Sequence, residues 1–453
     1  MYFVLVADAG NAHHTPYMLP RPTTPVGLEL ADDIDLRSIL LKSRRLGVRQ
    51  RTQTYSDWIR RVQGRGESMY HRVVTSRVDR TVTVLDPQTG VEQEMLMFGS
   101  NTYLGLTTHP YVEERMKAAI DEWGVGVGGA PLLSGYSRLH RDLEARMADF
   151  KGTEDAVIYQ SGYGANMGVL TALLGKRDVA YYDSLSHACT IDGLNLASGA
   201  AVKFPHNDVD ALAEMLEQPV EGDRFVCVEG VYSMDGDLAP LDRIVPLAKR
   251  HDAIVVLDDA HGVGVVGRQG RGTADHFGVS DDVEVLMGTF SKVFGVTGGV
   301  ICTSRAISDY LRHFSRANVF SSSLPPATIA AVHAGLDLLE RDDSIVAQLH
   351  DNVAYFGQRL RGLGFDVHPE AAIVPLFVPP EMNLRRAVRY IHDQGIFANA
   401  VEYPAVAVSQ QRIRFSLMAS HTREDVDRVV DVVEDVWNRF ANGVPARSAS
   451  RAA

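Results

Sequence analysis

Cysteine is scarce in this sequence, and the few that occur exclude two kinds of protein. The chain has 453 residues and 3 cysteines, Cys189, Cys227 and Cys302, which lie far apart and form no CxxC pair. An odd number of cysteines at this spacing argues against a disulfide framework and against a zinc site. A reducing compartment is the natural interpretation, so we expect a cytoplasmic protein.

Long apolar runs and dense basic segments are missing as well. No window approaches about 18 uninterrupted apolar residues, so we expect no transmembrane helix. The start, MYFVLVADAGNAHH, lacks the basic region of a secretory signal. The formal net charge is -12 and no Lys/Arg stripe is present, which argues against a nucleic-acid partner. Hydrophobic content of 45% and charged content of 23% are those of an ordinary soluble globular protein.

Between about residue 140 and residue 335, short apolar runs alternate with helical patterns. The strand-like runs are AVIY, VAYY, FVCV, IVVLDD, VEVLM and GVICT. Helix-like segments separate them, among them LHRDLEARMADFKG, GANMGVLTALLG and LDRIVPLAKRHD. Nearly continuous apolar strands between helices are typical of a mostly parallel sheet with helices on both faces. The pattern predicts a large α/β domain.

The two ends of the chain have different patterns. DDIDLRSILLKSRRLGV and TYSDWIRRVQG look like short helices near an irregular arm, and the tail GVPARSASRAA is expected to fray. After the helical stretch SSSLPPATIAAVHAGLDLL come the strand-like FDVHP, AIVPLFV and RIRFSL, with the helix-like NLRRAVRYIHDQG before the last. We expect an N-terminal arm with helices (1–95), the α/β domain (96–335), a smaller α+β domain (336–442) and a frayed tail (443–453).

Polar and glycine-rich segments follow the predicted strands, where ligand groups gather in parallel sheets. AVIY is followed by QSGYGAN, with Ser161, Gly162 and Tyr163 just before a helix. Glycines let backbone N–H groups approach a ligand and a helix N-terminus favours an anion, although an ordinary turn would read the same way. VAYY leads to His187, and FVCV leads to the acidic loop EGVYSMDGDLAPL with Ser233. A lone histidine is more often structural.

Two further strand ends carry a carboxylate and an amine. Asp258 and His261 follow IVVL, and a carboxylate in that position needs a proton-donor partner when it is desolvated. Lys292 follows VEVLM within GTFSKVFG, where an unpaired ammonium is disfavoured. An amine that can form a Schiff base, next to an anion site, fits pyridoxal 5′-phosphate (PLP), and a carboxylate would keep its ring nitrogen protonated. Neither a metal-ligand cluster nor a serine-nucleophile elbow competes with this reading.

With these residues in place, the chain resembles the α-oxoamine synthases, PLP-dependent acyltransferases of fold type I. The likeness runs from LMFGSNTYLGLTTHP to RIRFSLMASHT and includes SGYSRLHRDLEARMADFKG, EGVYSMDGDLAPL, DDAHGVGVVGRQGRG, TFSKVFG and SSSLPP. The resemblance implies a decarboxylative Claisen-type condensation that gives an α-aminoketone. Its substrates would be a small amino acid such as glycine, alanine, serine or threonine, and an acyl-CoA or acyl-carrier-protein thioester. It also implies a homodimer with shared active sites.

The resemblance also implies a role for each catalytic candidate. Lys292 would form the Schiff base with PLP and later act as the base at the substrate Cα. Asp258 would pair with the pyridine nitrogen, and His261 would contact the ring hydroxyl. His187 would stack on the ring. The other implied cofactor contacts are Ser161, Gly162, Tyr163, Ser233, Thr289 and, from the neighbouring subunit, Ser322 within the segment Ser321 to Ser323.

Two residues are implied in substrate binding, and three positions depart from the family pattern. Asn101 would lie near the substrate, and Arg414 would clamp the amino acid carboxylate with its planar fork of donors. Thr102 stands where many members have aspartate. Ala130 and Pro131 replace the hydroxyl, glycine or arginine residues common in members, which weakens a succinyl-type acyl substrate.

Two alternative functions remain open at this stage. Fold and cofactor do not settle the reaction, so an aminotransferase of the same fold would carry the same motifs. A non-catalytic paralogous subunit of a heterodimer is the other alternative, and such a partner would be expected to lose the lysine. The N-terminal arm has no function that the sequence suggests.

Overall fold

The chain divides into two units, which are described separately. The computed structural model describes residues 36–86, 88–441 and 443, and the units are Met1–Ser68 and Met69–Ala453. In the first unit, helices α1 (Leu36–Ser43) and α2 (Val48–Gly64) pack through Ile39, Trp58 and Val62. These are the two helices that the sequence predicts. The predicted irregular arm before residue 36 and the frayed tail beyond residue 443 lie outside the described residues.

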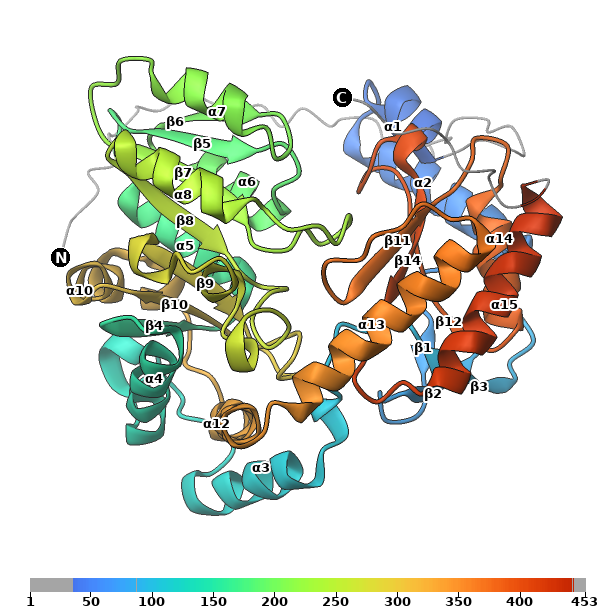
Figure 1. The fold of residues 1–453 in the computed structure, drawn as a ribbon, viewed down its shortest axis with the longest axis horizontal. Helices are drawn as coiled ribbons and strands as arrows, with labels where there is room; N and C mark the ends of the chain where they lie inside the picture. Colours follow the sequence, from blue (N-terminus) through green and yellow to red (C-terminus); the bar gives the residue numbers. More distant parts are fainter. Residues whose placement is uncertain (1–35, 87, 442, 444–453) are drawn as a thin grey trace, which may run out of the picture. The chain divides into compact units, whose positions relative to one another are not determined.

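A seven-stranded sheet forms the centre of the large α/β part of the second unit (Figure 1). Its strands, in spatial order, are β4 (Asp155–Tyr159), β10 (Gly299–Thr303), β9 (Val285–Thr289), β8 (Ala253–Asp258), β7 (Arg224–Glu229), β5 (Val179–Asp183) and β6 (Ala200–Phe204). Strand β10 runs antiparallel to both neighbours, and the other neighbouring pairs are parallel. The mostly parallel α/β sheet is confirmed, together with every strand predicted for it. Strand β6 was not predicted, because all but one of its residues are exposed and it has no apolar run.

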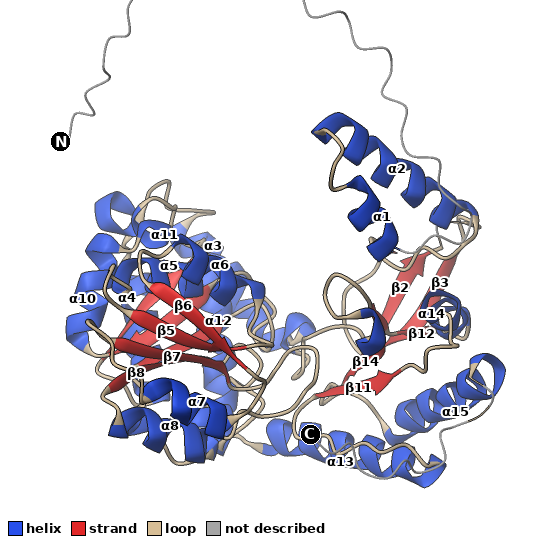
Figure 2. Ribbon diagram, turned by 90° about the horizontal axis from the view of Figure 1, so that it is seen from above, coloured by secondary structure: helices blue, strands red, loops and turns tan. Residues whose placement is uncertain are grey.

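Helices cover both faces of this sheet because its strands are apolar on both sides. Ala156 and Ile158 of β4 belong to one core cluster, while Val157 and Tyr159 belong to another, as the alternation of a strand requires. Figure 2 shows α5 and α6 on one face and α7 and α8 on the other. The helices of this part are α3 (Pro110–Trp123), α4 (Arg138–Lys151), α5 (Gly162–Leu173), α6 (Ala188–Leu196), α7 (Val209–Leu216), α8 (Leu241–Arg250), α9 (Thr273–His276), α10 (Arg305–Phe314), α11 (Arg316–Val319) and α12 (Pro326–Arg341).

A smaller α+β part follows in the chain. Its antiparallel sheet has the order β11 (Ile373–Phe377), β14 (Arg412–Ser416) and β13 (Asn399–Val401). Its helices are α13 (Ser344–Leu363), α14 (Leu384–Asp393) and α15 (Arg423–Phe440). The strands predicted at AIVPLFV and RIRFSL and the helix at NLRRAVRYIHDQG are confirmed. The strand expected at FDVHP is wrong: residues 365–369 form no strand, and Pro369 has no N–H to donate to a ladder.

A third sheet lies where the sequence suggested only an arm and helices. It has the order β1 (Val73–Val74), β2 (Thr81–Leu85), β3 (Glu92–Met97) and β12 (Ile396–Phe397), and β12 runs parallel to β3. Residues near the start and the end of the second unit therefore share one sheet. The proposed boundaries at residues 96, 336 and 443 stay predictions. Among the described residues no helix is long and apolar enough to cross a membrane.

Candidate active site

The carboxyl ends of β7, β8 and β9 bring the predicted acid and amine groups together. Glu229 and Asp258 are the last residues of β7 and β8, and they face each other in the parallel register. Both side chains are buried. Thr289 ends β9, and Lys292 follows it within the next turn. The structure thus places the expected chemistry at one edge of the sheet.

Asp258 is a buried carboxylate that is held by hydrogen bonds. Asn166 Nδ2 donates to its Oδ2 at 2.5 Å, the backbone N–H of Ala260 donates to Oδ1 at 3.1 Å, and Cys189 Sγ lies 3.8 Å from Oδ2. Burial raises the pKa of Asp258, whereas the Ala260 N–H, the nearby His187 and the Asn166 amide oppose that rise. Asn166 was missed by the sequence analysis, although an amide inside the apolar helix GANMGVLTALL is a signal that could have revealed it.

Glu229 differs from Asp258 in having an oxygen without a partner. Its Oε1 is buried and accepts no hydrogen bond from the described residues. Burial, and then the charge of Asp258, raise the pKa of Glu229 well above its usual range. Because Asp258 has donors and Glu229 Oε1 has none, a proton shared by this pair resides on Glu229.

Lys292 has the environment of a reactive amine. It is half-buried, and no acidic side chain of the described residues lies within ion-pair distance of it. Burial and the charge of Arg414 lower the pKa of Lys292, although Asp258 and Glu229 oppose this. A lysine that loses its proton more easily is suited to nucleophilic attack on a carbonyl group.

His261 is a buried neutral imidazole in a hydrogen-bonded chain. Burial, and then the charge of Lys292, lower the pKa of His261 well below its usual value. Tyr103 OH lies 2.7 Å from His261 Nδ1 and donates to Asn101 Oδ1 at 3.2 Å. The single hydroxyl proton cannot serve both contacts, so Nδ1–H donates to Tyr103 and Nε2 is left as an acceptor. Tyr103 lies inside SNTYLGL, and sequence reasoning gave it no role.

Arg414 is buried without a counter-charge. Its Nε donates to the Ser233 carbonyl at 2.8 Å, Nη1 to Ser416 Oγ at 3.1 Å and Nη2 to Asn101 Oδ1 at 3.0 Å. All three acceptors are neutral oxygens, and in the described part of the chain no carboxylate forms an ion pair with Arg414. Arg412, two residues earlier on the same strand, pairs with Asp235 at 2.6 Å and is neutralised. A guanidinium has five N–H donors, so the three bonds leave Arg414 with donors for an incoming acid.

The start of α5 has the form of an anion site. Ser161 caps the helix by accepting from the Gly164 N–H at 3.0 Å. The N–H groups of Gly162 and Tyr163 have no hydrogen-bond acceptor among the described residues. A Cβ on Gly162 would lie 2.8 Å from Thr289 Cβ, so only glycine lets this backbone pack against the end of β9. Free N–H groups at a helix N-terminus suit a phosphate.

The remaining predicted residues differ in whether they contact the site residues described above. His187 caps α6 with an exposed ring, and its Nδ1 accepts from the Cys189 N–H at 3.2 Å. Ser233 is half-buried beside Arg414. Ser322 is exposed, and in the described part of this single chain no contact connects it to the others. Its predicted place in the site depends on a second subunit.

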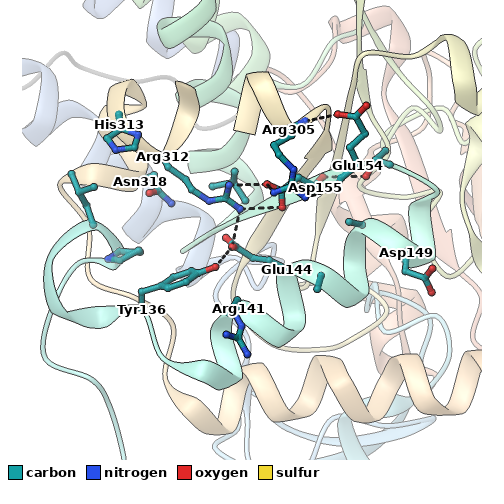
Figure 3. Close-up of a pocket in the computed structure, with 16 residues that line it drawn as sticks. Tyr136, Arg141, Glu144, Asp149, Glu154, Asp155, Arg305, Arg312, His313 and Asn318 are labelled. Carbon is teal, nitrogen blue, oxygen red and sulfur yellow. Dashed lines mark hydrogen bonds and ion pairs between the residues drawn. The ribbon is translucent and has the colours of Figure 1, made fainter. Parts of the chain in front are cut away.

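A separate cavity of about 700 Å³ lies away from these residues (Figure 3). Its wall is formed by α4, the segment before it and α10, and Arg312 bridges Glu144 at 3.0 Å and Asp155 at 2.8 Å. A second cation, Arg305, lies 3.5 Å from Asp155, so two arginines balance the two carboxylates. None of the predicted site residues lines this cavity, so it is not the catalytic site.

The fold and the site together define a PLP-dependent enzyme of fold type I. Comparisons with known proteins agree. The family model described as aminotransferase class I and II matches residues 93–433. A serine palmitoyltransferase from Bacteriovorax stolpii is 40% identical over 82% of this chain and 88% of its own. An 8-amino-7-oxononanoate synthase from Bacillus pumilus is 37% identical over 84% of this chain and 96% of its own.

Solved structures give the same result. A serine palmitoyltransferase from S. paucimobilis with a bound PLP–myriocin aldimine superposes with a TM-score of 0.80 and 27% identity, covering 90% of this chain and 99% of that one. The chain belongs to the α-oxoamine synthase family. It is a PLP-dependent acyltransferase of the type that condenses an amino acid with an acyl thioester, and the predicted family, fold and cofactor are confirmed.

The residues present fit PLP on structural grounds. The free N–H groups of Gly162 and Tyr163 suit its phosphate, and the buried carboxylate of Asp258 suits its ring nitrogen. The half-buried Lys292 has no partner among the described acids and suits its aldehyde.

Proposed function

We propose that this acyltransferase condenses a small α-amino acid, such as glycine, alanine, serine or threonine, with an acyl thioester of coenzyme A or a carrier protein. The product is an α-aminoketone, formed with loss of the thiol and of CO₂. The observation that carries the proposal is the buried Arg414, whose neighbours are neutral oxygens and whose unused donors suit one carboxylate.

The proposed roles follow from the contacts of each residue. Gly162 and Tyr163 hold the cofactor phosphate, with Ser161 and Thr289 beside them. Asp258 would hold a proton on the ring nitrogen, and His261 Nε2 would be the acceptor for the ring hydroxyl. When bound, PLP supplies an aldehyde that captures amines and a ring that accepts electrons from the substrate Cα.

The reacting atoms are handled by Lys292, Arg414 and Asn101. Arg414 orients the amino acid through its carboxylate. Asn101 accepts a hydrogen bond from Arg414 and so lies beside the proposed carboxylate site. Lys292 Nζ takes the proton from the substrate Cα. The Cα then bonds to the thioester carbonyl carbon, and the sulfur leaves as a thiolate that takes a proton from solvent. The carboxylate departs as CO₂, and Lys292 Nζ returns the proton to the Cα. His187, whose ring is exposed at the start of α6, would stack on the cofactor ring.

A homodimer is part of the proposal. Ser322 is exposed and makes no described contact with the site residues of its own chain, which supports a place near the phosphate of a second copy. Ser233 would contact a cofactor oxygen from within its own chain. The cytoplasmic location remains a prediction.

The test is thiol release by the purified, PLP-loaded protein. Glycine, alanine, serine and threonine are each offered with a panel of acyl-CoA esters. We expect thiol release that requires both partners. No release from any pair, with conversion of the cofactor to its amine form by an amino donor, would instead support the aminotransferase alternative. Failure to bind PLP at all would support the non-catalytic subunit.

A further inference from the structure

The loop of residues 230–238, which follows β7, supports both arginines of β14. The carbonyl of Ser233 accepts a hydrogen bond from Arg414 Nε at 2.8 Å. Asp235 pairs with Arg412 Nη1 at 2.6 Å, and the Met234 carbonyl accepts from the same atom at 3.0 Å. The position of this loop therefore sets the position of the guanidinium proposed to clamp the amino acid.

The other side of the same loop is held by a histidine between two acids. His206, in the turn after β6, contacts Asp183 Oδ1 through Nδ1 at 3.0 Å and Asp237 Oδ2 through Nε2 at 2.8 Å. Asp183 is fully buried at the end of β5, while Asp237 belongs to the loop. A ring that faces a carboxylate at each nitrogen must donate at both, so His206 is an imidazolium.

The surroundings of His206 stabilise that charge. Burial lowers the pKa of His206, but the hydrogen bonds and charges of Asp183 and Asp237 outweigh it and raise the pKa to about 10. Asn207 Nδ2 donates to Asp237 Oδ2 at 3.2 Å and to the Leu238 carbonyl at 3.2 Å. The ring of Tyr232 lies edge-on to His206 with 4.4 Å between centroids. His206 and Asn207 thus connect the loop to the buried Asp183 at the end of β5.

We propose that His206 is a positioning residue, which fixes the 230–238 loop to the end of β5 so that the loop holds Arg414 ready for the amino acid carboxylate. His206 touches neither the substrate nor the cofactor and acts through Asp237 and Ser233. The inference rests on the proposed role of Arg414. It gives the turn after β6 an indirect role in amino acid binding. None of the site residues predicted from the sequence lies in that turn.

The test measures amino acid binding in two variants and one control. His206→Phe removes both contacts, and Asp237→Asn removes only the charge on the loop. Asp210→Asn is the control, because Asp210 is 94% exposed on α7 and pairs with Arg243 at 3.4 Å only. The dissociation constant of the amino acid is read without acyl donor, from the absorbance of the PLP-loaded protein. Thermal unfolding of the cofactor-free variants shows whether they fold.

Both variants should weaken amino acid binding about 5- to 30-fold, since each loosens a charge-assisted hydrogen bond. The rate at saturating substrate, the KM for the acyl thioester and the affinity for PLP should change by less than about 3-fold, and the control should match the wild type.

Three outcomes overturn the inference in distinguishable ways. Normal amino acid binding by both variants, while Arg414→Met binds poorly, refutes the role of His206 and leaves the carboxylate clamp intact. Normal binding by Arg414→Met as well refutes the proposed clamp itself. A parallel loss of PLP, thioester and amino acid affinity would show that His206 only stabilises the fold, which also overturns the positioning role.

Discussion

A methyl group added at Gly162 tests the proposed phosphate site. The new Cβ would lie 2.8 Å from Thr289 Cβ and 2.9 Å from Thr289 Oγ1. Carbon atoms in contact lie about 3.5–4.0 Å apart, so Thr289 or the start of α5 must move by about 1 Å. Gly299 packs closely against the other side of this backbone, since a Cβ on Gly299 would lie 2.7 Å from Gly162 Cα.

The expected loss follows from the groups that this movement displaces. Overpacking of this kind costs about 1–3 kcal/mol. If the helix start yields, the N–H groups of Gly162 and Tyr163 turn away from the phosphate. A hydrogen bond to a charged group contributes about 1.5–3 kcal/mol, so losing one should weaken PLP binding roughly 10- to 150-fold.

The assay is a titration of the cofactor-free Gly162→Ala variant with PLP, followed by absorbance. Gly362→Ala is the matched control, because Gly362 lies in α13 and a Cβ there meets nothing within 4 Å. The control should bind PLP like the wild type. If Gly162→Ala also binds PLP with wild-type affinity, the start of α5 does not hold the phosphate.

Three other variants test the groups at the strand ends. Lys292→Ala should abolish thiol release, and a variant with the wild-type rate would contradict its proposed role. Arg414→Lys should raise the KM for the amino acid about 10- to 150-fold and leave PLP affinity unchanged, because an ammonium cannot form the two-pronged contact; an unchanged KM would count against the clamp. Glu229→Gln should retain activity within about 3-fold at neutral pH, since the raised pKa of Glu229 keeps the native acid uncharged. The stability of the wild type should fall as pH rises from the ordinary carboxyl pKa toward the raised pKa of Glu229, because in this range the unfolded chain binds fewer protons than the folded chain. Thermal melts of Glu229→Gln should lack this fall.

The sequence predicted the central sheet well because its signals are local. Each central strand is a short apolar run between helical patterns, and burial on both faces explains that composition. Strand β1 has two residues and β6 is mostly exposed, so neither has an apolar run. Strands β2 and β3 were missed although TVTVL alternates polar and apolar residues, which is the pattern of a half-buried strand. Pairing of β3 with β12 depends on the folded chain and leaves no periodic pattern.

Site residues that directly follow a strand could be predicted from the sequence. Residues that act by contacting another site residue could not. Asp258, His261 and Lys292 are visible as polar groups directly after apolar runs. Asn166 and His206 are ordinary polar residues in sequence, and only the fold brings them to Asp258 and Asp237. Their roles are properties of tertiary contacts, which spacing along the chain does not encode.

The two arginines of β14 show how the presence or absence of a counter-charge distinguishes a structural arginine from a candidate binding residue. Arg412 and Arg414 lie on one face of one strand, both buried, and composition gives no reason to prefer either. Arg412 is neutralised by Asp235, much as the buried Lys151 is neutralised by Asp259 at 2.9 Å. In the part of the chain that the structure describes, Arg414 has neutral acceptors only. A buried cation without a counter-charge is costly in a finished fold, which supports the proposal that the carboxylate of the amino acid balances Arg414.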